Sequence, residues 1–303
     1  NQLTSYNSIV LEYDKNGNLT KKTENGTDVT TYTFDYENKI TRIDYPDETY
    51  SAYKYDPLER RIEKRDRSGN IRRYVYDGQN FIAEYDGSNS LLASYVQGLG
   101  IDQPISMYRG GEMYWYHSDA LRSIYQVTSS GEAVAKSYDY SAFGKIINQN
   151  GSLQNPFTYT GREWDNDSGL YYYRARYYDA EVGRFLGRDT QITRNPNLYA
   201  YVNNNPMNLI DPTGLLAAEA CIGLGLEPPL GWIVIGVCVV CGIVTALLIK
   251  RVEPPDPLKL CWNIGWLQLS PDMKNCIYEC PDGFDRFLPL PMNEACPDPW
   301  VFN

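Results

Sequence analysis

A repeat in the first third of the chain constrains the fold more than any other feature. Four pairs of an aromatic residue and an aspartate recur at intervals of 21 residues: Tyr13-Asp14, Phe34-Asp35, Tyr55-Asp56 and Tyr76-Asp77. A fixed period of about 20 to 50 residues indicates stacked units, none of which buries its apolar face alone. We therefore expect a repetitive structure, with a plain β-sandwich of chance spacing as the alternative.

Each repeat has the composition of a strand, a turn and a second strand. Asn25-Gly26 separates two runs rich in Thr and Tyr, which is a strong signal for a β-hairpin. After each aromatic-Asp pair the aspartate can accept a hydrogen bond from its own backbone two residues further on. Tyrosine suits such a sheet, because its ring packs while its hydroxyl reaches a partner. The sequence predicts a mainly β fold, with no convincing amphipathic helix before residue 110.

Further motifs extend this pattern and identify a resemblance. They are "YWYHSDALRSIYQVTSSGEAVAKSYDYSAFGKI" (residues 114–146), "NPFTYTGREWDNDSGLYYYRARYYDAEVGRFLGRDT" (155–190) and "NLYAYVNNNPMNLIDPTGL" (197–215). Together with the aromatic-Asp pairs, residues 1–215 resemble bacterial Rhs (YD-repeat) proteins, which include the C components of insecticidal toxin complexes. The resemblance implies a hollow β-sheet shell, closed at one end by a core that forms a plug.

The resemblance also implies a division of the chain and an activity. Residues 1–110 would be YD repeats, 111–215 the Rhs-associated core, and 216–303 a variable C-terminal tail. Such cores cut their own backbone just after an Asp-Pro-x-Gly-Leu motif, here ending at Leu215, and the freed tail is a toxin. The predicted scissile bond is Leu215–Leu216, and the cut is a single intramolecular event.

The residues alone leave few routes to such a cut. The only histidine is His117, no cysteine precedes the junction and no zinc-protease motif occurs, so we expect neither a metal nor another cofactor. Two carboxyl groups that share a proton can activate a water and protonate the leaving amine. The resemblance assigns these acids to Asp189 and Asp211, with Arg176 in support.

Two observations stand against this assignment. Thr190 follows Asp189, whereas the family usually has a proline there. Asp211 begins an Asp-Pro-x-Gly turn in which Pro212 sets φ and Gly214 can adopt a positive φ, so both aspartates would then only accept turn hydrogen bonds. The turn is also compatible with cleavage, because a rigid turn would present the scissile bond to the acids at high effective concentration.

The composition changes abruptly at the junction. Of the 27 tyrosines 26 precede residue 216, and all seven cysteines follow it. Residues 230–249 contain no charge, which is about the length that one bilayer crossing requires. Trp232 and Lys250-Arg251 match an aromatic anchor and a cytoplasmic flank. A transmembrane segment is expected, with a buried core element as the alternative.

The last part of the tail contains four cysteines among several prolines. Cys261, Cys276, Cys280 and Cys296 suggest a small loop-rich knot, with two disulfides favoured over zinc or free thiols. A cytoplasmic flank at Lys250-Arg251 conflicts with disulfides, because cytoplasmic thiols stay reduced. The tail has no histidine and no catalytic constellation, so membrane permeabilisation fits its composition better than a soluble enzyme.

Charge and the chain's beginning bear on partners and location. The net charge of −10 is shared evenly between residues 1–215 and 216–303, which argues against nucleic acid as a partner. The chain opens without a signal peptide and reads as a fragment of a longer, secreted or delivered bacterial effector for interbacterial competition. Expected partners are its own tail as cargo, an immunity protein, a secretion-system or shell-capping protein, and a membrane. The alternative is a structural or cell-surface YD-repeat protein, uncut and anchored by its tail.

Overall fold

The computed structural model describes residues 2–190 and 197–215, together with the backbone of five strands in the tail. The chain forms two compact units. The first comprises residues 1–222 with 238–244, and the second comprises 223–237 with 245–303. Each unit is described by itself below.

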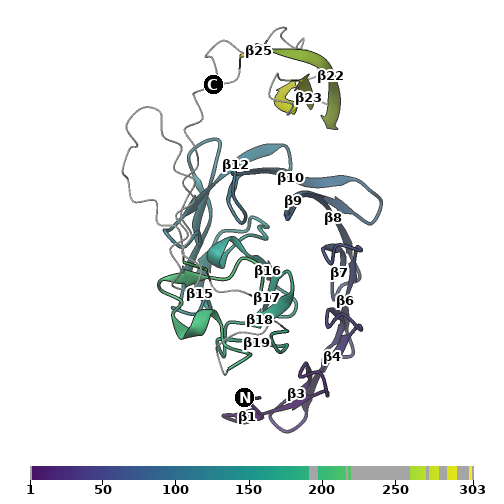
Figure 1. The fold of residues 1–303 in the computed structure, drawn as a ribbon, viewed down its shortest axis with the longest axis vertical. Coiled ribbons are helices and arrows are strands. Elements are labelled where there is room, and N and C mark those ends of the chain that lie inside the picture. The colour runs from purple at the N-terminus through teal and green to yellow at the C-terminus, as the bar shows by residue number, and fades with distance from the viewer. Residues whose placement is uncertain are drawn as a thin grey trace, which may run out of the picture. The chain divides into compact units, whose positions relative to one another are not determined.

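The first unit contains a long antiparallel sheet whose strands follow one another in sequence order. It curves around a smaller sheet, as Figure 1 shows. Because each strand pairs with the next, every connection is a short turn, as expected for hairpin repeats. The fifteen strands are β1 (Ser5–Tyr6), β2 (Ile9–Tyr13), β3 (Leu19–Glu24), β4 (Asp28–Phe34), β5 (Ile40–Asp44), β6 (Tyr50–Tyr55), β7 (Arg61–Arg65), β8 (Ile71–Asp77), β9 (Asn80–Asp86), β10 (Leu91–Gln97), β11 (Pro104–Arg109), β12 (Glu112–Ser118), β13 (Ile124–Ser129), β14 (Val134–Tyr140) and β15 (Ile146–Asn150).

The mainly β prediction is confirmed for the described residues. The Asn25-Gly26 hairpin joins β3 to β4, with both turn residues at positive φ (+52° and +76°). Thr27 N–H donates to the Glu24 carbonyl at 3.1 Å and closes the two-residue turn. The sheet continues through β15, so the expected division at residue 110 lies within it.

Aspartates near the ends of several strands of the long sheet build a recurring turn, and Asp35 and Asp56 of the repeat are two of them. Asp35 Oδ1 accepts the amide N–H groups of Glu37 and Lys39, each at 2.9 Å. Asp56 does the same two and four residues further on, and the residue three positions after each aspartate has a positive φ. The same carboxylate bonds recur at Asp86 and Asp119. Each side chain therefore fixes one bend of the sheet.

Two tyrosines of the repeat link neighbouring strands of the long sheet. The Tyr55 hydroxyl donates to the Ile40 carbonyl at 2.7 Å, and the Tyr76 hydroxyl donates to the Arg61 carbonyl at 2.9 Å. In both cases the acceptor lies 15 residues earlier. A half-buried ring with a satisfied hydroxyl is the arrangement that the tyrosine-rich sequence predicts.

The smaller sheet lies against the long one. It contains β16 (Glu163–Asp165), β17 (Leu170–Tyr173), β18 (Arg176–Asp179) and β19 (Arg184–Phe185), in that order. Its side chains share a core with the first strands of the long sheet, formed by Leu11, Leu19, Tyr32, Ile40, Ile43, Tyr53, Leu170, Tyr172, Tyr177 and Leu186. Two 3-10 helices (Tyr159–Gly161 and Val202–Asn204) and the pair β20 (Leu209–Ile210) and β21 (Ala218–Glu219) complete the described part of this unit.

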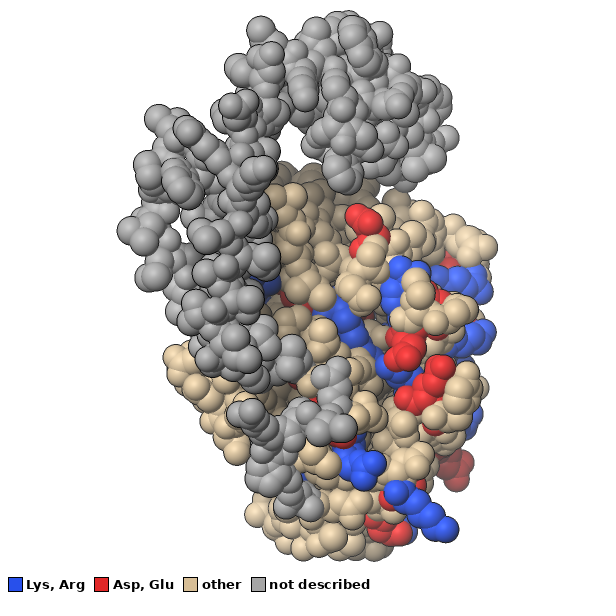
Figure 2. Space-filling view, viewed as in Figure 1, with Lys and Arg blue, Asp and Glu red and all other residues tan. Residues whose placement is uncertain are grey.

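Charged side chains of both signs are interspersed on the face of the molecule in Figure 2. In the long sheet, charged side chains pair across neighbouring strands. Lys21 contacts Glu12 at 2.7 Å, and Lys54 contacts Glu63 at 2.7 Å. Exposed pairs of this kind contribute little stability, but like charges facing each other across strands would oppose pairing.

The second unit contains a four-stranded sheet in the order β24-β23-β22-β25. These strands are β22 (Leu260–Ser270), β23 (Met273–Glu279), β24 (Asp285–Pro291) and β25 (Trp300–Val301). The structure thus differs from the loop-rich knot expected here, because Cys261 and Cys276 lie in strands. In register, the backbone of Cys261 is opposite Trp300 and that of Cys276 is opposite Trp266 and Leu288.

Several expectations for the tail fall on residues that the structure does not describe. The apolar segment 230–249 lies outside the described residues, and so do Cys280 and Cys296. Among the residues that are described, no helix is both long and apolar enough to cross a membrane. The membrane segment, the disulfides and their alternatives therefore stay predictions.

Candidate active site at the Asp-Pro-Thr-Gly-Leu turn

The residues from Asp211 to Leu215 form a tight turn directly after β20. Asp211 Oδ1 accepts the amide N–H groups of Thr213 (3.2 Å), Gly214 (2.8 Å) and Leu215 (3.2 Å). The Asp211 residue is buried, and Gly214 has a φ of +77°. Asp211 therefore has the turn role that the sequence offered as its alternative.

The turn is hydrogen-bonded to the connection between β17 and β18. Arg174 donates to the Pro212 carbonyl, Ala175 N–H donates to the Thr213 carbonyl at 3.1 Å, and Arg176 Nε donates to the Gly214 carbonyl. Three consecutive donors thus hold three consecutive carbonyl groups. The backbone immediately before the predicted scissile bond is fixed against the core.

Arg176 also connects this turn to both candidate acids. Its Nη2 lies 3.3 Å from Asp189 Oδ2 and 3.8 Å from Asp211 Oδ2. The guanidinium stacks over the Phe185 ring at 3.7 Å, and Nη1 donates to the Leu198 carbonyl at 3.1 Å. One nitrogen atom therefore contacts two carboxylates from segments that are 22 residues apart.

The electrostatics of this cluster follow from its burial. The Arg176 side chain is 7% exposed, and the side chains of Asp189 and Asp211 are 10% and 3% exposed. Burial lowers the pKa of Arg176 from its ordinary value, although Asp189 and Asp211 act in the opposite direction. An arginine retains its charge at neutral pH even so.

The structure brings together most of the site residues that the sequence predicts. Asp189, Arg176 and the turn residues from Asp211 to Leu215 meet, whereas Leu216 lies outside the described residues. Thr190 in place of proline does not leave Asp189 unsupported, because Asp189 N–H donates to the Leu198 carbonyl at 2.9 Å.

His117 takes part in the long sheet. It lies in β12, and its Nε2 is 2.9 Å from the Thr128 hydroxyl of the next strand. Within the part of the chain that the structure describes, no group of three His, Cys, Asp or Glu residues is arranged to hold a metal ion.

Sequence reasoning missed a second arginine at this turn. Arg174 contacts Pro212 as described above, and Asp102 pairs with Arg174 at 2.7 Å. The Arg-Ala-Arg spacing of Arg174 and Arg176 was the one available signal, because alternate residues of a tight connection can reach the same neighbour. Nothing in the sequence around Asp102 indicates its contact with residues more than 70 positions away.

Comparison with known protein families agrees with this architecture. The family model described as teneurin YD-shell matches residues 1–207. The chain belongs to the YD-shell family. The expected Rhs/YD-repeat relationship is thereby confirmed.

Two relatives show where else this shell occurs. The tRNA3(Ser)-specific nuclease WapA of Bacillus spizizenii is 37% identical over 227 residues, which cover 71% of this chain and 9% of that protein. The double-stranded DNA deaminase toxin A of Burkholderia cenocepacia is 26% identical over 256 residues, covering 73% of this chain and 18% of that toxin. The chain thus spans only a small part of either relative.

A solved structure has the same fold. The crystal structure of TcdB2-TccC3-TEV aligns with a TM-score of 0.51 and 18% identity, over 68% of this chain and 13% of that chain. At this identity the likeness concerns the arrangement of strands alone.

Proposed function

We propose that this YD-shell chain is the C-terminal part of a toxin that holds residues 216–303 as cargo and releases them by cutting its own backbone between Leu215 and Leu216. The observation that carries the proposal is the position of Arg176, which contacts Asp189, Asp211 and the Gly214 carbonyl at once. A buried carboxylate cluster beside a rigid turn suits a single, intramolecular hydrolysis.

The two aspartates are given different roles. Oδ1 of Asp211 accepts three amide N–H groups, and hydrogen bonds of this kind favour the ionised form of a carboxylate. Asp211 therefore acts as an ionised anchor that shapes the turn. Asp189, which Arg176 holds beside it, acts as the general base.

The hydrolysis then proceeds in two steps. Asp189 takes a proton from a water molecule as the water oxygen attacks the Leu215 carbonyl carbon. The protonated Asp189 next donates that proton to the Leu216 nitrogen as the C–N bond breaks. The products are a carboxyl group on Leu215 and an amine on Leu216, so one water is consumed and no covalent intermediate with the enzyme forms.

The named activities of the relatives support a toxic cargo. One relative is named as a tRNA nuclease and the other as a DNA deaminase toxin, although each aligns with about seven tenths of this chain. A common shell with different activities is what a variable tail predicts. For this chain, the charge-free segment 230–249 supports a tail that acts on membranes.

Single substitutions test which residues make the cut. We expect Asp189→Asn and Asp211→Asn to lower the cleavage rate by at least about 100-fold, because each removes a charge that Arg176 contacts. Denaturing electrophoresis should show two fragments from the parent and one chain from each variant. The freed tail fragment should float with lipid vesicles in a density gradient.

Asp56→Asn is the matched control. Asp56 accepts amide bonds in a turn of the repeat, and asparagine keeps a carbonyl acceptor there. This variant should be cut like the parent. The proposed acids would be excluded if Asp189→Asn and Asp211→Asn are cut as fast as the parent. Membrane activity would be excluded if the tail fragment stays in the soluble fraction.

A further inference from the structure

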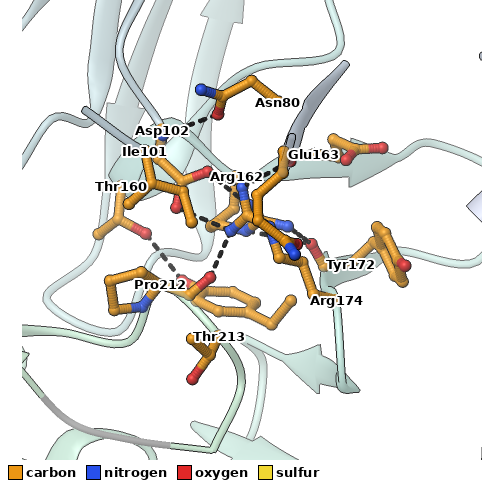
Figure 3. A network of polar contacts seen from close by, with 12 residues as sticks. Asn80, Ile101, Asp102, Thr160, Arg162, Glu163, Tyr172, Arg174, Pro212 and Thr213 are labelled. Atoms are coloured by element: carbon orange, nitrogen blue, oxygen red, sulfur yellow. Dashed lines mark hydrogen bonds and ion pairs between the residues drawn. The ribbon is translucent and has the colours of Figure 1, made fainter. Parts of the chain in front are cut away.

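Arg174 connects the cleavage turn to the repeat sheet. Besides the Pro212 carbonyl, it contacts Asp102 through Nη2 at 2.7 Å and Nη1 at 3.1 Å, and it donates to the Gln79 carbonyl at 3.1 Å. Gln79 lies between β8 and β9, and Asp102 lies between β10 and β11. One guanidinium therefore joins two bends of the long sheet to the turn that precedes the scissile bond. Figure 3 shows Arg174 close to Asp102 and Pro212.

Asp102 is held in this position from several sides. The residue is 5% exposed, and its Oδ1 also accepts from Nη1 of the buried Arg162 at 2.5 Å. Arg162 in turn donates to the Tyr172 carbonyl of β17. The Asp102 N–H donates to the Asn80 side chain at 3.3 Å, which ties the 98–103 bend to β9. The Asp102 carboxylate thus bridges Arg162 and Arg174 of the core. It reaches them only when the long sheet is docked onto the core.

Arg174 lies in the tight connection between β17 and β18. Arg174 has a φ of +58°, a conformation that costs a non-glycine residue of order 1 kcal/mol or more unless its surroundings impose it. Arg174 and Ala175 form the two-residue turn between Tyr173 of β17 and Arg176 of β18, and this hairpin turn imposes the positive φ. Arg176, which contacts both candidate acids, is only two residues away, so the contacts of Arg174 also fix the approach of the hairpin to the turn.

We propose that Arg174 and Asp102 are positioning residues that make the cut conditional on docking of the repeat sheet onto the core. This inference rests on the proposed self-cleavage. While the sheet is undocked, Arg174 lacks the carboxylate of Asp102, which orients its guanidinium group toward the Pro212 carbonyl. Once the sheet is seated, the turn is clamped and the cut proceeds. The tail is then released only after the surrounding wall has formed.

Cleavage kinetics of the full chain test this coupling. The chain is synthesised in a cell-free system with a short pulse of labelled methionine, and the appearance of fragments is followed during the chase. We expect Arg174→Ala to slow the cut by about 100-fold, which is the scale of a displacement of about 1 Å at a reacting group. Asp102→Asn should slow it comparably, although Asp102 has no described contact with the turn. Arg174→Lys should recover part of the rate.

A matched control separates positioning from general stability. Glu84 is as buried as Asp102 and pairs with Arg109 at 2.6 Å within the same sheet. Glu84→Gln should therefore lower the melting temperature but leave the cleavage rate of folded chains within about twofold of the parent. A low concentration of guanidinium chloride should partly restore cutting in Arg174→Ala, because the free guanidinium ion can replace the missing side chain. The pH at which the cleavage rate of Arg174→Ala is half-maximal should equal that of the parent, because the proposed proton-transfer group is Asp189.

The outcomes distinguish this inference from the proposed function. A parent that stays uncut overturns both. If the parent is cut, and Arg174→Ala and Asp102→Asn are cut at the same rate, the coupling is overturned but the proposed self-cleavage stands. If Asp102→Asn fails to fold, Asn80→Ala carries the test, because it removes the side chain that holds the Asp102 bend. It should slow the cut, and a parental rate in this variant contradicts the coupling.

Discussion

Gly214 has a backbone position that no other residue type can occupy without rearrangement. Its φ is +77°, and a Cβ atom built there would lie 2.2 Å from the Tyr173 carbonyl oxygen. That oxygen belongs to the backbone of β17, so it cannot move aside as a flexible side chain would. Glycine thus permits the close approach through which residues 174 to 176 hold the turn.

Gly214→Ala should consequently abolish cutting and destabilise the first unit. The matched control is Gly26→Ala, because Gly26 has nearly the same φ (+76°) but no atom within 4 Å of the added Cβ. The control should lose about 1–2 kcal/mol of unfolding free energy from φ alone and still be cut. Denaturant unfolding and electrophoresis measure both effects. Parental cutting by Gly214→Ala would show that the clamped turn is not needed.

At this scale the sequence was informative where the chemistry is local. The Asp-Pro-Thr-Gly-Leu letters predict the turn, and the resemblance to Rhs proteins points to Asp189 and Arg176. Arg174 and Asp102 could not be found in the same way, because their pairing joins positions 72 residues apart. A single aspartate in "GLGIDQP" has no periodicity or motif that reveals such a partner.

Strands β7 and β16 are joined by a buried charge cluster. Arg61 pairs with Glu163 at 2.7 Å, and both side chains are less than 7% exposed. Asp165 accepts from Lys64 at 2.6 Å and from the Tyr53 hydroxyl at 2.8 Å. These contacts fix the register of the core on the sheet more specifically than apolar packing does, and losing one partner would leave a buried charge unpaired.

The pH dependence of stability should report on this cluster. Burial by itself would raise the pKa of Asp165, but Lys64 and Arg61 outweigh it and lower the pKa below its ordinary value. A lowered folded-state pKa contributes stability above the unfolded value of about 4, and this stability is lost as the pH falls through the folded value.

Asp165→Asn should therefore be less stable than the parent at neutral pH and should lose less stability on acidification. Urea unfolding of both proteins between neutral and acidic pH measures the difference. Curves that run parallel over this range would exclude Asp165 as a contributor.

The elements also divide into those that local patterns predict and those that they do not. The strands and turns of the repeat follow from hairpin residues and from aspartates that accept their own backbone N–H groups. The position in which the core packs on the long sheet depends on contacts such as that of Arg61 with Glu163, which are 102 residues apart. In the tail, prolines and cysteines suggested loops, whereas β22, β23 and β24 are strands.

At the scale of the whole molecule, the proposed function links a sheet and a core to a cargo through one peptide bond, Leu215–Leu216. The long sheet and the core form one unit, and most of the tail forms another. The proposed cut lies within the first unit, which contains residues 1–222 and 238–244. Cutting there would leave β1 to β20 in one fragment, with the clamps on Pro212, Thr213 and Gly214 intact.

The most direct test is the intact mass of the purified 303-residue chain under denaturing conditions. We expect two masses, corresponding to residues 1–215 and 216–303, and a new N-terminus at Leu216. A single mass for the whole chain, from protein shown to be folded by cooperative unfolding, would contradict self-cleavage. It would instead favour a structural YD-shell protein that keeps its tail attached.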